Sequence, residues 1–211
     1  MRDLKRSIVT SIFVTALVWP VLASANYNET PDGDLSGNYL SPTPIALVPN
    51  GSTTISGTIQ GAGMGVSVDL DYFTVTVPAG QALVALNVLP GTVGGGAIGS
   101  FIGVYSGPTA VDPAGALSTA ALGYYLYRAA YIGTDILDNM ATFNFNGTNP
   151  SIGFIPPLFP GAYTFWIQEG FNGTFPYNFE LVLNSVPEPS TALLMMAGLA
   201  MILRRHRREN K

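Results

Sequence analysis

The strongest constraint on the fold of this chain is a period-two alternation of apolar and polar side chains that recurs along its middle. In the segment 71–77, Phe73, Val75 and Val77 share one face, and a tyrosine and two threonines occupy the other. Such alternation, with many β-branched and aromatic residues, is typical of strands. The same pattern predicts further strands at 53–59, 82–89, 101–105, 142–145, 162–168 and 177–183. The tyrosine-rich segment 122–128 fits the pattern poorly; we expect a strand there, and a surface loop is the alternative.

Turn-forming residues separate these segments. Pro-Ala-Gly at 78–80, Pro-Gly pairs at 90–91 and 160–161, and three Asn-Gly pairs favour tight turns and hairpins. Five glycines between Gly91 and Gly99 predict a flexible loop. We therefore expect an all-β fold, a single jelly-roll-like β-sandwich over residues 26–185.

Charge and the rarer residue types exclude several functions. Between Asn26 and Val186 there is one base, Arg128, against ten acids, a net charge of −9. Electrostatic binding to nucleic acid requires clustered Lys and Arg side chains, so no nucleic-acid partner is expected. The chain has no cysteine, and its one histidine, His206, lies in a basic run near the C-terminus. Disulfides, thiolate zinc sites and a Ser-His-Asp triad are thereby excluded from the middle.

The N-terminus predicts a secretory signal peptide at residues 1–25. Three bases within the first six residues precede an apolar run at 8–22. Ala23 and Ala25 are the small residues that signal peptidase requires, which predicts cleavage after Ala25. The alternative is a retained membrane anchor, although a run of 15 residues is shorter than the roughly 20 that span a bilayer.

The C-terminal segment 186–211 has three parts in a fixed order. The motif Val186, Pro187, Glu188, Pro189 and Ser190 comes first. An apolar run at 192–203 predicts a transmembrane helix. The bases Arg204, Arg205, Arg207 and Arg208 follow and would stop transfer on the cytoplasmic side.

This order resembles the PEP-CTERM sorting signal. The resemblance implies a Gram-negative bacterium and an exosortase, a membrane protease that recognises the Pro187-Glu188-Pro189 motif and removes the helix. The chain would cross the inner membrane, be anchored transiently in the cytoplasmic membrane, and then reach the cell surface or the extracellular space. Proteins of this kind accompany extracellular polysaccharide, which makes exopolysaccharide in a biofilm an expected partner. The alternative is a permanently anchored periplasmic protein.

The middle resembles a second family, the bacterial pre-peptidase C-terminal domain. The resemblance rests on the acidic strand pattern at 69–80, the aromatic segment 159–168 and the lead-in 29–36. It implies a β-sandwich, often calcium-binding, that is appended to secreted enzymes and linked to adhesion or polymer binding. Such domains usually accompany a catalytic domain, and this chain contains none.

Acidic residues are the candidates for chemistry. Asp69 and Asp71 share parity with the apolar face of their strand, where an unpaired carboxylate is costly. Calcium takes six to eight oxygen ligands and would stabilise such groups. The hypothesis is one calcium site that uses some of Glu29, Asp32, Asp34, Asp69 and Asp71. Turn capping and solvated carboxylates at the strand edge are the alternative.

A carboxylate-based glycoside hydrolase is the competing function, since two carboxylates can cleave a glycoside without His or Cys. The pairs Asp69/Asp71 and Glu169/Glu180 could supply them. Nothing in the sequence raises the pKa of one member, so we expect no enzyme, no catalytic residue and no obligatory cofactor. Trp166 and the tyrosines could stack on sugars or lie in the core. The expectation is an exported, non-enzymatic binding or structural protein.

Overall fold

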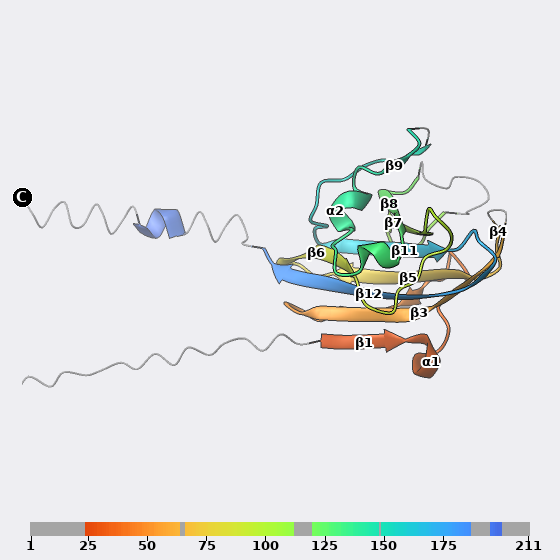
Figure 1. Cartoon of the computed structure of the whole chain (residues 1–211). Coiled ribbons are helices and arrows are strands. Elements are labelled where there is room, and N and C mark those ends of the chain that lie inside the picture. The colour runs from red at the N-terminus through yellow and green to blue at the C-terminus, as the bar shows by residue number, and fades with distance from the viewer. Residues whose placement is uncertain (1–23, 64–65, 112–119, 148, 187–194, 200–211) are drawn as a thin grey trace, which may run out of the picture.

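The computed structural model describes residues 24–63, 66–111, 120–147, 149–186 and 195–199. Within these residues the chain is mostly β-structure, as the alternation predicts (Figure 1). Two mixed five-stranded sheets make up the fold, together with one two-stranded sheet. Each large sheet is antiparallel apart from one parallel pair.

The first sheet runs in the order β1-β3-β12-β6. Its strands are β1 (Ser24–Asn28), β3 (Ser52–Gly63), β12 (Gly173–Ser185) and β6 (Gln81–Val88). The short strand β4 (Val66–Ser67) pairs with β3. Strand β1 is the parallel member, and Figure 1 shows it at the edge of the sheet beside β3.

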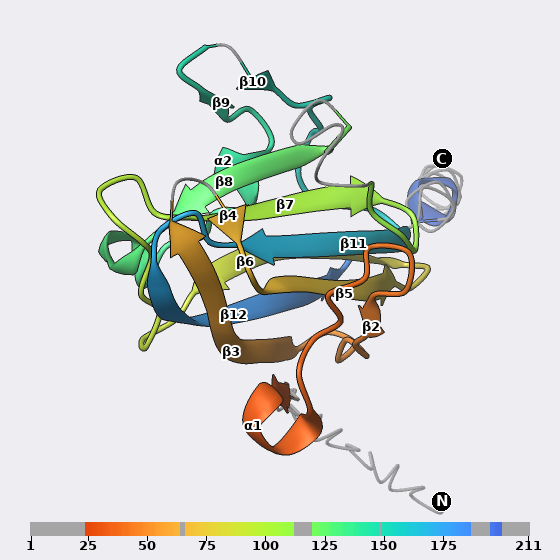
Figure 2. The ribbon, with the colours of Figure 1, turned by 90° about the vertical axis from the view of Figure 1, so that its right-hand side faces the viewer.

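The second sheet runs in the order β2-β5-β11-β7-β8. Its strands are β2 (Thr43–Pro44), β5 (Leu70–Val77), β11 (Gly161–Gln168), β7 (Ser100–Ser106) and β8 (Gly123–Tyr127). Figure 2 shows β8, β7, β11 and β5 side by side in that order. The remaining elements are short: α1 (Glu29–Asp32), η1 (Ala129–Tyr131), α2 (Leu137–Met140), β9 (Asn144–Phe145) and β10 (Asn149–Pro150).

One apolar core joins the two sheets. Ile55 and Phe179 of the first sheet belong to the same buried cluster as Phe73 and Phe165 of the second. The Phe73 and Phe165 rings stack with their centroids 4.9 Å apart. All buried residues of this cluster lie between Leu35 and Leu183, so the segment 26–186 contains the whole of it.

The second sheet is also covered on its other face, which corrects one detail of the strand pattern. The alternation places Tyr72 on the polar face of its strand, yet Tyr72 is fully buried. Its ring stacks on Trp166, with centroids 5.9 Å apart, in a second apolar cluster. The even positions of β5 are therefore not uniformly exposed, because other parts of the chain pack over that face.

The predicted strands match the structure to within a few residues, and the strand expected at 122–128 is β8. The loop at 91–99, predicted to be flexible from its glycines, packs against the domain. The amide of Gly95 donates to Glu169 Oε2 at 3.0 Å. Glycine suits this position because a β carbon on Gly95 would collide with the Glu169 carboxylate.

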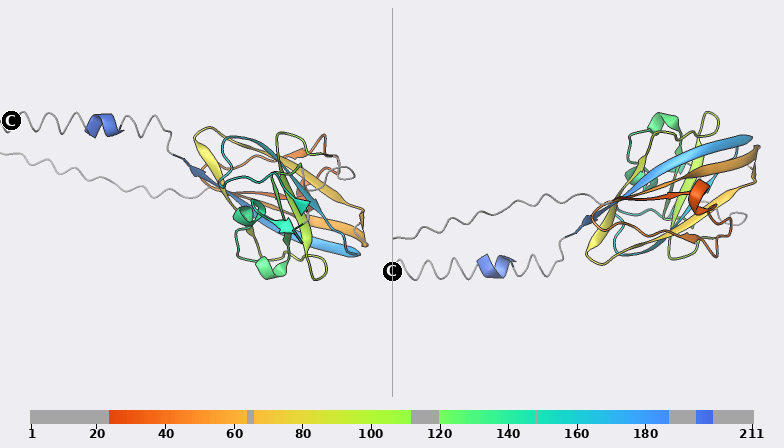
Figure 3. Two further views of the ribbon diagram at one scale, coloured as in Figure 1. Left: turned by 90° about the horizontal axis from the view of Figure 1, so that it is seen from above. Right: turned by 90° about the horizontal axis from the view of Figure 1, so that it is seen from below.

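Strand β1 begins, and strand β12 ends, at the same end of the domain (Figures 1 and 3). The strand registers agree, because Ser24 pairs with Ser52 and Ser52 pairs with Val182. Helix α1 and strand β4 lie toward the opposite end (Figure 1).

Most of the two predicted targeting segments lies outside the described residues. Of the predicted signal peptide, only Ser24 and Ala25 are described, and both belong to β1. Of the segment 186–211, the description covers Val186 and the helical residues 195–199. No helix among the described residues is long and apolar enough to cross a membrane. The predicted transmembrane helix at 192–203 is not tested by that finding.

Candidate metal centre

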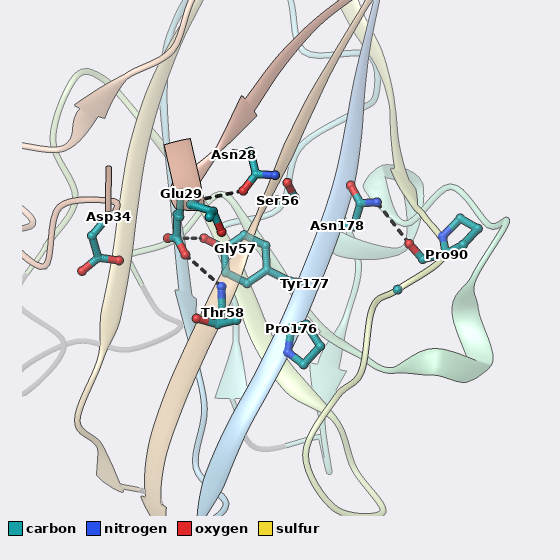
Figure 4. Close-up of a pocket in the computed structure, with 12 residues that line it drawn as sticks. Asn28, Glu29, Asp34, Ser56, Gly57, Thr58, Pro90, Pro176, Tyr177 and Asn178 are labelled. Carbon is teal, nitrogen blue, oxygen red and sulfur yellow. Dashed lines mark hydrogen bonds between the residues drawn. The ribbon is translucent and has the colours of Figure 1, made fainter. Parts of the chain in front are cut away.

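Glu29 begins the single-turn helix α1 directly after β1, and three donors hold its carboxylate. The Tyr177 hydroxyl donates to Oε1 at 2.8 Å, and the Leu35 amide donates to the same oxygen at 3.3 Å. The Thr58 amide donates to Oε2 at 2.8 Å. Figure 4 shows the Glu29 carboxylate joined by hydrogen bonds to Tyr177 and Thr58. Gly57 makes room for this arrangement, because a β carbon there would collide with the carboxylate.

Asp71 is the second residue of β5, and its side chain is fully buried, as its parity predicts. Neither of its carboxylate oxygens makes a hydrogen bond of ordinary geometry. Burial raises the pKa of Asp71 to about 9, and the negative charge of Glu29 adds to the shift. The nearby Tyr177 hydroxyl lowers the pKa of Asp71, but its single proton is donated to Glu29 Oε1. An ionised carboxylate without partners is among the most costly groups to bury. The site therefore requires either a proton or a cation at Asp71.

Asp34 completes a group of three carboxylates. One oxygen each of Glu29, Asp34 and Asp71 lies within 4.8 Å of the others. Oxygens that bind one calcium ion at 2.3–2.6 Å lie at most about 5 Å apart, so the three side chains fit a shared ion. Asp34 is exposed and Asp71 is buried, so an ion between them would be reached from the surface.

The other two predicted ligands lie outside this group. Asp32 Oδ2 accepts from the Asn28 amide at 2.8 Å, which is the turn-capping role of the alternative hypothesis. Asp69 is half-buried at the entry to β5, and its pKa is raised by burial and by Asp34 and Glu29. The structure thus brings together three of the five predicted ligands.

An open hollow of about 440 Å³ adjoins the Glu29 and Asp34 carboxylates. Glu29, Asp34, Gly57 and Tyr177 lie on its wall, together with residues of β12 and the turn after β6 (Figure 4). Asp71 is not among the lining residues. A ligand in the hollow would therefore reach the Glu29 and Asp34 carboxylates, and the Asp71 carboxylate would contact a shared ion from the buried side.

Glu169 and Glu180, the other candidate catalytic pair, have separate partners. Glu169 is fully buried and accepts from the amides of Gly95 and Phe171 and from the Ser100 hydroxyl. Glu180 accepts from the Asn87 side chain at 2.9 Å. Sequence reasoning missed the structural role of Glu169, and its only signal was the glycine-rich loop that the carboxylate anchors.

The candidate sugar-stacking residues are divided between core and surface. Trp166, Tyr124 and Tyr127 are buried. Tyr125 and Tyr131 are half-buried beside a hollow of about 280 Å³, and their ring centroids are 5.3 Å apart. The guanidinium of Arg128, which lines the same hollow, lies 5.6 Å from the Tyr131 ring centroid.

Comparison with known proteins identifies the C-terminal segment. Residues 185–208 match the model of the PEP-CTERM protein-sorting motif. The motif implies exosortase-dependent export, with a membrane-anchored step before cleavage and display at the surface. No curated protein and no solved structure matches the chain. The resemblance of the middle to the pre-peptidase C-terminal domain is not confirmed and stays a prediction.

Proposed function

We propose that this chain delivers a calcium-binding, non-enzymatic β-sandwich to the cell surface, where it serves as a binding or structural component of an exopolysaccharide matrix. Sorting by the C-terminal motif supports the destination. The observation that carries the calcium site is Asp71, a fully buried carboxylate that makes no hydrogen bond of ordinary geometry and lies beside Glu29 and Asp34.

Calcium fits this donor set better than a transition metal does. The ligands are carboxylate oxygens, which hard cations prefer, and no histidine or cysteine is available in the segment 26–186. Backbone carbonyls and water would supply the remaining oxygens. With the ion bound, the two sheets would be linked through α1, since Glu29 contacts β3 and β12 while Asp71 lies on β5.

The acidic character of the domain gives calcium a second role. Residues 26–186 carry a net charge of −9, so an anionic polymer would be repelled in the absence of divalent cations. Calcium bound near the surface lowers that repulsion. Matrix association is accordingly expected to depend on calcium as well as on the polymer.

The test is thermal unfolding of the purified segment 26–186 with calcium or with a chelator. At about a hundred times its dissociation constant, one bound ion stabilises the domain by about 2.7 kcal/mol, which raises the melting temperature of a domain this size by about 8 °C. Asp34→Asn should lose most of that rise, and Asp138→Asn, an exposed acid on α2, should keep it. An unchanged melting temperature at millimolar calcium would refute the site.

A carboxylate glycosidase is the alternative function, and one experiment separates it from a binding protein. Glu29→Gln and Asp34→Asn variants would abolish polysaccharide cleavage if these hollow-lining acids were catalytic. A wild-type domain that binds polymer without releasing soluble sugar supports binding. Release of sugar that both variants abolish would contradict it.

A further inference from the structure

The two chain segments that meet the membrane emerge at one end of the domain. Strand β1 begins there after the predicted signal peptide, and β12 ends there before the sorting motif (Figures 1 and 3). The Val186 amide donates to the Gly80 carbonyl at 2.9 Å, which fixes the first residue of the motif against the domain. We define the exit end as residues 49–52, 78–83, 153–161 and 182–186, which the pairs Leu83–Leu158 and Gly161–Val77 bring together.

The exit end carries no charge. None of its residues is Asp, Glu, Lys, Arg or His. The carboxylates of Glu29, Asp34 and Asp71 lie away from it, because Glu29 follows the far end of β1, about 17 Å along the strand from Ser24. A domain with a net charge of −9 between residues 26 and 186 thus has one neutral end, and both membrane-directed segments leave from it.

The same end presents two large apolar side chains to solvent. Ile155 is 87% exposed and Phe159 is 54% exposed. Their neighbours fix the loop between them, since Phe154 packs against the core and Leu158 is buried. Leu158 also exchanges two backbone hydrogen bonds with Leu83, at 2.9 and 3.0 Å. The exposed side chains are therefore held outward by an anchored loop.

The backbone of this loop suits a lipid interface. Positions 156, 157 and 160 are prolines, so half of the residues from Ile155 to Pro160 have no amide hydrogen to satisfy. Irregular backbone near hydrocarbon costs free energy because its amide N–H groups find no hydrogen-bond acceptors there. The loop combines apolar side chains with few such donors.

We propose that the exit end rests on the outer surface of the cytoplasmic membrane while the chain is anchored, with Ile155 and Phe159 in the interfacial layer of the lipid bilayer. The anchor keeps the loop close to the lipid, so a weak contact suffices. Anionic lipid repels the distant acidic end and not the neutral exit end. The contact holds the sorting motif at the membrane surface, where a membrane protease acts. This proposal depends on the membrane-anchored step of the proposed function, and it does not depend on the calcium site.

Removal of the C-terminal segment would free the domain. Two apolar side chains bury far less area than an acyl chain, and even one acyl chain binds a membrane only reversibly. The surface thus assists orientation while the anchor is present and leaves the processed domain soluble.

The test uses the chain from Asn26 with its complete C-terminal segment, inserted into vesicles of phosphatidylethanolamine and phosphatidylglycerol with brominated acyl chains. Phe159→Trp places a fluorophore in the loop. Val68→Trp is the matched control, because Val68 is 58% exposed and lies beside β4 at the opposite end. The signal of the buried Trp166 is subtracted with the unsubstituted chain, and Ile155→Trp gives an independent second probe.

Loss of fluorescence in brominated relative to ordinary vesicles is expected for Phe159→Trp and Ile155→Trp, with no loss for Val68→Trp. Equal quenching at both ends, or quenching at neither, would overturn the proposal. A chain that fails to float with the vesicles would overturn the anchoring and the proposal with it, while calcium-dependent melting of the segment 26–186 would be unaffected. Because no other protein is present, contact with lipid is distinguished from contact with the protease.

Discussion

Asp71→Asn provides the sharpest perturbation of the proposed metal centre. Asparagine keeps the shape of the side chain and removes the charge. In the wild-type domain without calcium, burial and the neighbouring Glu29 raise the pKa of Asp71 from 3.8 to about 9. The folded state therefore holds a proton that the unfolded chain releases, so the free energy of unfolding falls as pH rises between these two values.

The magnitude follows from proton linkage. One group that is protonated in the folded state and ionised in the unfolded state lowers stability by about 1.4 kcal/mol for each pH unit. Between pH 6 and pH 8 the calcium-free wild type should lose about 2.7 kcal/mol, or about 8 °C in melting temperature. Saturating calcium should abolish this slope, because the ion replaces the proton and leaves Asp71 ionised in both states.

The assay is thermal unfolding of the segment 26–186 at pH 6, 7 and 8, with a chelator or with calcium. The background is low because this segment contains no histidine, the side chain that ordinarily titrates in this range. Asp71→Asn should show little pH dependence in chelator and little response to calcium. The reasoning is refuted if wild type and variant share the same pH slope, or if calcium stabilises both equally.

Three further predictions concern the site, the core and the termini. Gly57→Ala should lower the melting temperature and abolish the calcium response, because its methyl group collides with the site's carboxylate, whereas Gly37→Ala meets only an ordinary contact and should retain the response. Glu169→Ala removes the acceptor of two backbone amides and should cost about 3 kcal/mol on unfolding; an unchanged midpoint in urea would contradict its structural role. Mass spectrometry of the mature protein should find Asn26 at the start and an end near Pro187, and an intact basic tail would argue against sorting.

The strands were predictable because each is a local pattern. The alternation at 71–77 gave the burial of Phe73, Val75 and Val77, and the same parity gave the burial of Asp71. Tyr72 was not predictable in this way. A covering layer on the outer face of a sheet depends on where distant segments pack, and the sequence of one strand contains no record of it.

The sequence was sufficient to predict which acidic residues could form the candidate site, but not which of them meet in space. Five acids flank turns and a strand entry, and the structure selects Glu29, Asp34 and Asp71 from them. The selection depends on Tyr177 and Thr58, which fix Glu29 from two other strands. Contacts between residues more than a hundred positions apart follow from sheet topology, which periodicity alone does not determine.

The family of the sorting signal was predictable from the sequence, because its recognition depends on linear order. The motif, the apolar run and the basic cluster are contiguous, and the match at residues 185–208 confirms the interpretation. The exit end is the opposite case. Its neutrality arises only when the turn at 78–80, the loop at 153–161 and the end of β12 meet in space.

A crystal structure of the segment 26–186 grown with calcium would show whether Glu29, Asp34 and Asp71 share one ion. The bound ion should give an anomalous peak with carboxylate oxygens of Glu29, Asp34 and Asp71 at about 2.3–2.6 Å. A protonated Asp71 that donates directly to Glu29, with no anomalous peak between them at millimolar calcium, would contradict a shared calcium site.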